Sequence, residues 1–240
     1  MRLFLCLFLI VSSPAHALQC RQALVLALDV SGSVNEEEYQ QQINGLAAAL
    51  DSEAVRSLIL FGADAPVSLA VFEWSSRNHQ LLIQPWISLD GANALDLAIA
   101  RIRAHRKQRA GLKTALGTSL MFAQALLEQR PDCWLHTIDV SGDGPNNIGA
   151  TPQEVYQSID FGRTTVNALV IGNTGWGTAE ADRALEAYYQ SSVIRGPAAF
   201  TMTAHGYSDY ARAMQRKLER ELQHPMLGQF DNGNEAQQPG

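Results

Sequence analysis

The sequence predicts an α/β fold, a doubly wound and mostly parallel six-stranded sheet with helices on both faces. Residues 24–28 are five apolar residues without a charge, which is typical of a strand buried on both faces. Strand-like and helical stretches then alternate almost to the end of the chain, a pattern that favours parallel strands joined by helices. With 240 residues, of which 46% are hydrophobic, the chain is long enough for one sizeable domain.

The individual elements follow from hydrophobic periodicity and from helix-end signals. Glutamates open the first helix, an alternating apolar pattern marks the second strand, and the third strand is expected to pair with the second as an antiparallel hairpin. Pro152 lies in the first turn of a later helix, a position that tolerates its missing N–H. The expected strands are 24–29, 67–74, 81–87, 134–140, 165–171 and 198–203. The expected helices are 36–50, 52–60, 92–104, 114–128, 152–161, 179–190 and 207–223.

Residues 1–17 have the three parts of a secretory signal peptide. A positively charged start is followed by an apolar run over residues 3–11 and by the A-x-A cleavage site Ala15-His16-Ala17. We therefore expect the protein to be exported, to the periplasm or out of the cell. The alternatives are a buried N-terminal helix and a lipoprotein acylated at Cys20, although Gln19 is a poor residue before such a cysteine.

The composition excludes two classes of partner. The net charge is -6, so the chain carries no basic surface for nucleic acid. No segment after the signal peptide is long and apolar enough to span a bilayer. The mature chain is expected to be one domain over residues 18–225, followed by a polar, disordered tail over residues 226–240.

Three loops carry oxygen side chains and lie on the same side of the predicted sheet. They are Asp29-Val-Ser31-Gly-Ser33, the segment 111–114 that ends in Thr114, and the segment after the fourth strand that contains Asp143. In a sheet of order 3-2-1-4-5-6, ligands bind at the carboxyl ends of strands 1 and 4, where the winding direction reverses. Asp29 ends strand 1 and Asp143 follows strand 4. Because clusters of oxygen ligands suit hard cations, we expect these loops to hold Mg²⁺ or Mn²⁺.

These residues resemble those of a von Willebrand factor type A domain with a metal-ion-dependent adhesion site. The family pattern is D-x-S-x-S, then a threonine, then an aspartate before glycine, and the likeness covers residues 22–223. In particular, the chain resembles an exported bacterial subfamily of unknown function. The resemblance implies that Ser31, Ser33 and Thr114 coordinate the metal, directly or through water. It also implies that Asp29 and Asp143 bind the metal or its waters, and that one coordination position stays open for an acidic side chain of a partner protein.

The chain offers two candidates for the threonine of the family pattern and departs from the pattern at one position. Thr114 and Thr118 both precede helical sequence, but only Thr114 has the glycine, leucine and alanine that the family places three, six and nine residues further on. The usual threonine before the third-loop aspartate is Gly142 in this chain. That position is not a central ligand, so the metal site is still expected.

The cysteines provide a test of the predicted strand order. Removal of the signal peptide would remove Cys6 and leave Cys20 and Cys133, an even pair in an exported chain. Cys20 precedes Asp29 by nine residues and Cys133 precedes Asp143 by ten. If strands 1 and 4 are parallel neighbours, about 4.8 Å apart, both cysteines lie at the amino end of the sheet within disulfide reach. A Cys20–Cys133 disulfide is therefore predicted.

Other functions compete with a binding module at these residues. Asp29, Ser31 and Ser33 could simply be helix caps. Ser141 resembles a nucleophile, but the elbow motif needs a glycine at position 139, where the chain has aspartate. An aspartate-based phosphotransferase would need a second acid at position 31. The main alternative is a metal-dependent hydrolase acting at the same loops, and we favour the non-enzymatic module.

Histidines, asparagines and tryptophans are further candidates for catalysis or for the rim of the site. His136 is expected inside a strand, and the remaining histidines of the mature chain (His79, His105, His205 and His224) show no pairing in the sequence. Three asparagines, Asn146, Asn147 and Asn173, flank the same face and are expected to be turn residues. Trp74 is expected in the core, whereas Trp176, in a glycine-rich loop, is a candidate for an exposed partner contact.

Overall fold

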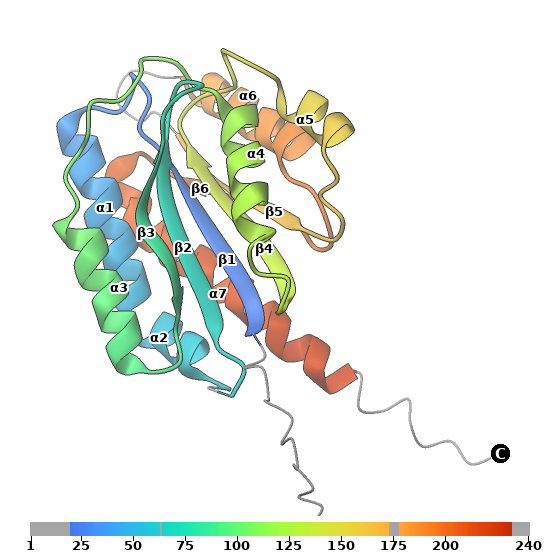
Figure 1. The fold of residues 1–240 in the computed structure, drawn as a ribbon. Coiled ribbons are helices and arrows are strands. Elements are labelled where there is room, and N and C mark those ends of the chain that lie inside the picture. Colours follow the sequence, from blue (N-terminus) through green and yellow to red (C-terminus); the bar gives the residue numbers. More distant parts are fainter. Residues whose placement is uncertain (1–19, 63, 173–177, 232–240) are drawn as a thin grey trace, which may run out of the picture.

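The computed structural model describes residues 20–62, 64–172 and 178–231, with side chains described as far as residue 223. Its centre is one six-stranded sheet of order β3-β2-β1-β4-β5-β6 (Figure 1). All neighbouring strands are parallel except β2 and β3, which form the expected antiparallel hairpin. The strands are β1 (Cys20–Asp29), β2 (Val67–Trp74), β3 (Gln80–Ser88), β4 (Cys133–Gly142), β5 (Thr165–Ile171) and β6 (Thr201–Ala204). The predicted fold class and strand order are confirmed.

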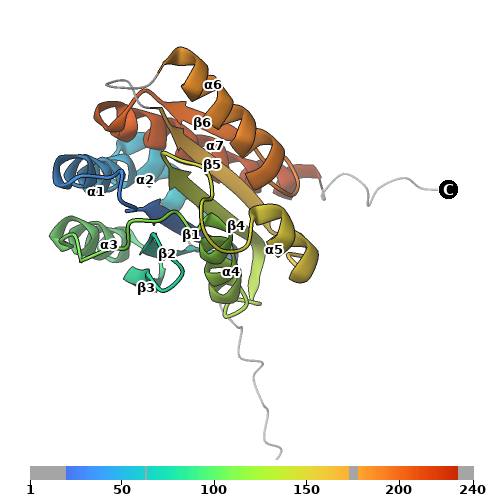
Figure 2. The same cartoon turned by 90° about the horizontal axis from the view of Figure 1, so that it is seen from above.

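Helices cover both faces of the sheet (Figure 2). One face carries α1 (Glu36–Asp51), α2 (Glu53–Leu60), α3 (Ala92–Ala104) and α7 (Tyr210–Asp231). The other face carries α4 (Leu116–Leu127), α5 (Pro152–Ser158) and α6 (Ala179–Tyr188), which continues into the π-helix η1 (Tyr189–Val193). A short 3₁₀ helix, η2 (Tyr207–Asp209), precedes α7. None of the described helices combines the length and the apolar character that a membrane span requires.

The central strand β1 supplies side chains to both hydrophobic cores. Leu24, Leu26 and Leu28 face the core under α1 and α7, whereas Ala23, Val25 and Ala27 face the core under α4. The smaller residues lie on the α4 side, so that helix packs close to the strand. This burial on both faces is what the uninterrupted apolar run predicted.

Several element bounds differ from the prediction because the relevant signal is tertiary. β1 begins at Cys20 rather than at residue 24, although Arg21 and Gln22 are polar. The Arg21 guanidinium is satisfied inside the protein because it donates to the carbonyls of Leu58 and Ile59 at the end of α2. The last helix continues to Asp231, beyond the expected residue 223, and residues 232–240 lie outside the described part. The expected signal peptide also lies outside the described residues.

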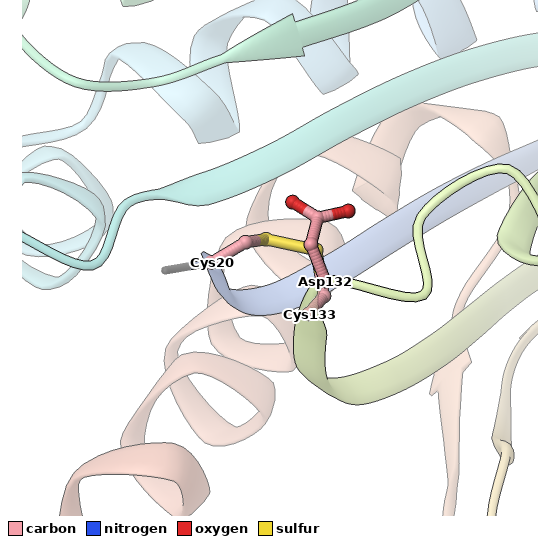
Figure 3. A group of neighbouring side chains, drawn as sticks. All are labelled: Cys20, Asp132 and Cys133. Carbon is pink, nitrogen blue, oxygen red and sulfur yellow. A yellow bond between two sulfur atoms is a disulfide. The ribbon is translucent and has the colours of Figure 1, made fainter. Parts of the chain in front are cut away.

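The predicted disulfide joins the amino ends of the two central strands (Figure 3). Cys20 pairs with Cys133 in the β1–β4 register, with 4.3 Å between the Cα atoms and 2.11 Å between the sulfurs. Asp132 lies beside the bridge and forms an ion pair with Arg130. Because both sulfurs are bonded to each other, neither is a thiolate that could bind a metal. The disulfide prediction is confirmed.

Candidate metal centre

The first loop leaves β1 directly into a turn that is organised by Asp29. The Asp29 carboxylate is fully buried, and its Oδ1 accepts a hydrogen bond from the backbone N–H of Ser31 at 2.8 Å. The following helix α1 is capped by Asn35 and Glu38, which bond each other's backbone N–H groups in a capping box. The alternative that Asp29, Ser31 or Ser33 caps this helix is therefore wrong.

The three loops bring their oxygen side chains into one hydrogen-bonded row. Thr114 Oγ1 lies 3.3 Å from Ser31 Oγ, which in turn lies 3.3 Å from Ser33 Oγ. The Ser33 hydroxyl donates to Asp143 Oδ1 at 2.8 Å. The structure thus brings all five residues of the family pattern together at the carboxyl ends of β1 and β4. It is Thr114, with only 5% of its surface exposed, that lies against Ser31, while Thr118 lies in α4 beside Gly149.

The charged forms of the two aspartates are unfavourable in their surroundings. Burial, together with the negative charge of Asp143, raises the pKa of Asp29 to about 8. Burial also raises the pKa of the Asp143 carboxyl. Asp29 Oδ2 is buried and has no hydrogen-bond partner among the described residues. A buried carboxylate oxygen without a partner, facing a second acid, is an arrangement that a bound cation would stabilise.

A tyrosine occupies the space left by the unusual glycine of the third loop. A Cβ atom on Gly142 would lie 2.4 Å from the Tyr189 hydroxyl and 3.2 Å from Asp29 Oδ2. Tyr189 is fully buried and begins the π-helix η1, a rare irregularity that is frequent near functional sites. Its hydroxyl donates to the Gly144 carbonyl at 3.2 Å. The departure from the family pattern at Gly142 therefore has a steric cause, which is the inward-pointing tyrosine.

The second and third loops are tied together by residues whose roles the sequence underestimated. Asn147 Oδ1 accepts the Thr114 N–H at 2.9 Å, and the Asn147 N–H donates to the Thr114 carbonyl at 2.9 Å. Asn146 Oδ1 accepts the N–H of Gly117 at the start of α4 at 3.2 Å. Tyr207, from η2, donates to Asp143 Oδ2 at 3.3 Å. Both asparagine side chains bond backbone N–H groups as expected, but neither residue lies in a turn. Asn147 holds Thr114 in place, and Asn146 holds the start of α4.

The residues considered for nucleophilic chemistry lie elsewhere. Ser141 is 1% exposed, with its hydroxyl 3.4 Å from Gln42 Oε1 and 3.4 Å from the Tyr210 hydroxyl. His136 Nε2 lies 2.9 Å from the Arg130 carbonyl, near the amino end of β4. Trp74 is fully buried, as expected for a core residue. Trp176 and Asn173 lie outside the described residues.

A buried carboxylate near the first loop has two histidine neighbours that the sequence did not reveal. Glu73 of β2 is fully buried, with Oε1 3.4 Å from His79 Nε2 and Oε2 3.4 Å from His105 Nε2. The Tyr39 hydroxyl donates to Oε2 at 3.1 Å. The sequence shows no pairing for these histidines, and the hairpin and the end of α3 bring both of them to one carboxylate. Apart from Asp132 and the bridged cysteines, no three His, Cys, Asp or Glu side chains in the described ranges have ligand atoms within 4.8 Å of one another, so this group is not arranged as a metal site.

Solved structures with the same fold include proteins of matrices and pili. Proximal thread matrix protein 1 from the mussel byssus, with a zinc-occupied MIDAS motif, is 20% identical over 85% of this chain and 48% of its own, with a TM-score of 0.59. The pilus adhesin SpaC from Lactobacillus rhamnosus GG, in an open conformation, is 14% identical over 87% of this chain and 30% of its own, with a TM-score of 0.59. The PilB minor pilin from Streptococcus sanguinis is 14% identical over 86% of this chain and 62% of its own, with a TM-score of 0.56.

The chain therefore spans less than two thirds of each of these proteins, and the likeness concerns the fold. No curated protein sequence matches the chain. A family model described as "Protein of unknown function (DUF1194)" matches residues 19–226. The chain thus belongs to this family, and it has the von Willebrand factor type A fold.

Proposed function

We propose that this protein is an exported binding module that captures an acidic residue of a partner protein through a divalent cation, Mg²⁺ or Mn²⁺. One observation carries the proposal. The buried Asp29 Oδ2 has no hydrogen-bond partner in the described structure and belongs to a group of five oxygen side chains from three loops. An all-oxygen donor set with two carboxylates fits a hard divalent cation, and it lacks the sulfur and imidazole ligands that softer metals prefer.

The residues of the chain divide the work of holding such an ion. Ser31, Ser33 and Thr114 would supply hydroxyl oxygens, which fill coordination positions without adding negative charge. Asp29 and Asp143 would supply the charge that balances the cation, directly or through water. A bound Mg²⁺ would act as an electrophile toward an incoming carboxylate, because the two acids do not over-neutralise it. Asn147 holds the second loop to the third, and Tyr207 holds the Asp143 carboxylate, so the donors are arranged in advance of a cation.

The comparisons support the proposal at the level of the fold. One structure of the mussel protein is described as having a zinc-occupied MIDAS motif, and SpaC is described as a pilus adhesin. We extend a divalent metal and a protein-binding role to this chain by analogy with those descriptions. The features of a signal peptide in residues 1–17 support export. An exported chain would present the proposed site to partner proteins in the periplasm or outside the cell.

The direct test is metal uptake followed by metal-dependent binding. Titration calorimetry should show Mg²⁺ or Mn²⁺ binding to the mature chain, and a pull-down from the native envelope should recover a partner in Mg²⁺ but not in EDTA. Asp29→Asn should abolish both while leaving the circular dichroism spectrum unchanged. Asp90→Asn is the matched control, since Asp90 is exposed and follows β3 at the opposite end of the sheet. Recovery of the same partner in EDTA would refute the proposal.

The hydrolase alternative predicts turnover rather than capture. A panel of phosphoesters and peptides should be cleaved by the metal-loaded protein if the alternative holds, and EDTA or Asp29→Asn should stop the cleavage. We expect no turnover, because the described loops present no buried base or nucleophile next to the oxygen row: Ser141 is enclosed and His136 lies toward the other end of β4.

A further inference from the structure

The most exposed large hydrophobic side chain of the described residues lies on a metal loop. Leu112 is 80% exposed, whereas Leu97, the next in rank, is 56% exposed. Single exposed leucines are common on protein surfaces and by themselves indicate nothing. Leu112 differs because of where it lies and how firmly its backbone is held.

Leu112 packs directly against the D-x-S-x-S turn. A Cβ atom on Gly32 would lie 2.9 Å from the Leu112 carbonyl oxygen and 3.2 Å from its Cδ2 atom. Gly32 stands between Ser31 and Ser33, so the leucine side chain borders the row of hydroxyls. The glycine is needed here for close approach of the two loops, and that approach places an apolar side chain at the edge of the proposed metal position.

Hydrogen bonds on both sides of Leu112 fix the loop. The Gly111 N–H donates to Ser75 Oγ at 3.0 Å, and the Lys113 N–H donates to Ser76 Oγ at 3.2 Å. Both serines lie at the end of β2, so the loop is attached to the sheet. Because the backbone is already anchored, little backbone entropy is lost when a partner covers this side chain, and such preorganisation favours binding.

The exposed charges that neighbour the second loop and the first loop along the chain have opposite signs. Lys113 is exposed next to Leu112, on the side of the second loop. Glu36 and Glu37 are exposed in the first turn of α1, on the side of the first loop. A second acidic group of a partner is therefore favoured near Lys113 and disfavoured near α1.

Building on the proposed function, we infer that the partner presents its metal-binding carboxylate next to an apolar side chain that packs on Leu112. The segment recognised is thus an aspartate or glutamate with a leucine, isoleucine, valine, methionine or aromatic residue at one fixed offset. Any second acid lies on the side of that apolar residue, toward Lys113. The cation supplies the capture of a carboxylate, and Leu112 selects which carboxylate.

The test is selection of peptides from a random library displayed on phage. The mature protein is immobilised in Mg²⁺, and bound phage are eluted with EDTA. The expected consensus is one acidic residue with an apolar residue at a constant spacing. Acidic peptides without an apolar position would overturn the inference and leave the proposed function intact. A selection that yields no acidic residue, or no phage eluted by EDTA, would instead overturn the proposed function and with it this inference.

Two variants separate the leucine from the metal. Leu112→Ser should weaken binding of the selected peptide about tenfold, the equivalent of losing most of one buried leucine contact, while Mg²⁺ affinity stays unchanged. Leu97→Ser, an exposed leucine on α3, is the matched control and should bind the peptide as the wild type does. Equal peptide affinity for Leu112→Ser and the wild type would rule out the leucine contact.

Discussion

The fold treats two pairs of neighbouring acids differently, one pair in the core between β4 and α7 and the other at the carboxyl ends of β1 and β4. In the core pair, Asp139 of β4 and Glu221 of α7 share one lysine: Lys217 Nζ lies 2.6 Å from Asp139 Oδ1 and 2.6 Å from Glu221 Oε1. In the loop pair, Asp29 and Asp143 meet hydroxyl groups and backbone N–H groups. The first pair has a cation from the chain itself, whereas no described lysine or arginine forms an ion pair with the second.

Under the proposed function, the same kind of acidic pair serves structure in one place and binding in the other. Lys217 is a permanent part of the chain, so its ion pairs with Asp139 and Glu221 hold α7 against the sheet. A pair of acids without such a lysine keeps its charge available for a cation from solution. Burial raises the pKa of Asp139 to about 7 even beside Lys217, and that of Asp29 to about 8. Asp139 and Asp29 are thus both costly to bury, and under the proposed function a bound cation would relieve the loop pair.

The largest expected effect comes from removing the resident cation. Lys217→Met would leave Asp139 and Glu221 facing each other in the core, so we expect the free energy of unfolding to fall by about 3–5 kcal/mol. Urea denaturation measures it, and added Mg²⁺ should not restore the loss. Lys113→Met, at an exposed position, is the control and should change stability by less than about 0.5 kcal/mol. A small loss in Lys217→Met would show that the core pair does not depend on its lysine.

A double-mutant cycle tests how tightly Tyr189 packs against Gly142, next to the loop pair. Gly142→Ala places a methyl group 2.4 Å from the Tyr189 hydroxyl, so we expect a loss of about 2–3 kcal/mol from overpacking. In the Tyr189→Phe background the nearest ring atom is 3.6 Å away, and the same substitution should cost far less. The coupling energy from urea denaturation of all four proteins reports the contact. Additive losses would mean that the tyrosine does not fill this space.

A further buried acid outside the two pairs, Glu73, tests whether neighbouring histidines can supply a positive charge. Its neighbours are His79, His105, Tyr39 and Lys107, whose Nζ donates to the Val34 carbonyl and lies 5.9 Å from the Tyr39 ring centre. Burial raises the pKa of Glu73 from 4.5 to about 7. A raised carboxyl pKa contributes stability that is complete below about pH 4.5 and is lost as the pH rises through about 7.

Glu73→Gln should therefore match the wild type near pH 4.5 and exceed it by about 1–3 kcal/mol at pH 8, because the variant never has to bury the charge. Urea denaturation at four pH values measures the difference. Asp96→Asn, an exposed acid on α3 that pairs with Arg56, should show no comparable gain with pH. If the variant were less stable than the wild type at pH 8, the histidines and Lys107 would be supplying an effective positive charge.

The smallest expected effect is on the stability of Asp29→Asn, and it is a gain where Lys217→Met shows a loss. In EDTA, Asp29→Asn removes one of two repelling carboxylates, so we expect stability to be unchanged or higher by about 1 kcal/mol. In Mg²⁺ at ten times its Kd, the wild type should gain about 1.4 kcal/mol and the variant nothing. Thermal scans with and without Mg²⁺ show both. A clear loss of stability for Asp29→Asn in EDTA would contradict the view that the loop pair is in need of a cation.

Much of this protein was determined by local sequence. The apolar run at 24–28 and the alternation of strands and helices predicted the parallel sheet, since strands buried on both faces are typical of parallel sheets covered by helices. The sheet order then predicted that Asp29 and Asp143 meet, and that Cys20 and Cys133 meet at the other end. These contacts could be foreseen because the cysteine and the aspartate are spaced almost equally on the two strands, and neighbouring parallel strands place such residues side by side.

Other contacts were decided only by the tertiary structure. Tyr189 enters the loop site through a π-helix, and no periodicity marks the residue at which a helix widens. Lys217 reaches Asp139 across the space between α7 and the sheet, while His79 and His105 reach Glu73 from two separate elements. A hydrophobic pattern reports which side of an element is buried and says nothing of which polar group it will face there. For that reason the sequence could indicate the donors of the proposed metal site, whereas the groups that hold those donors in place emerged from the packing of distant segments.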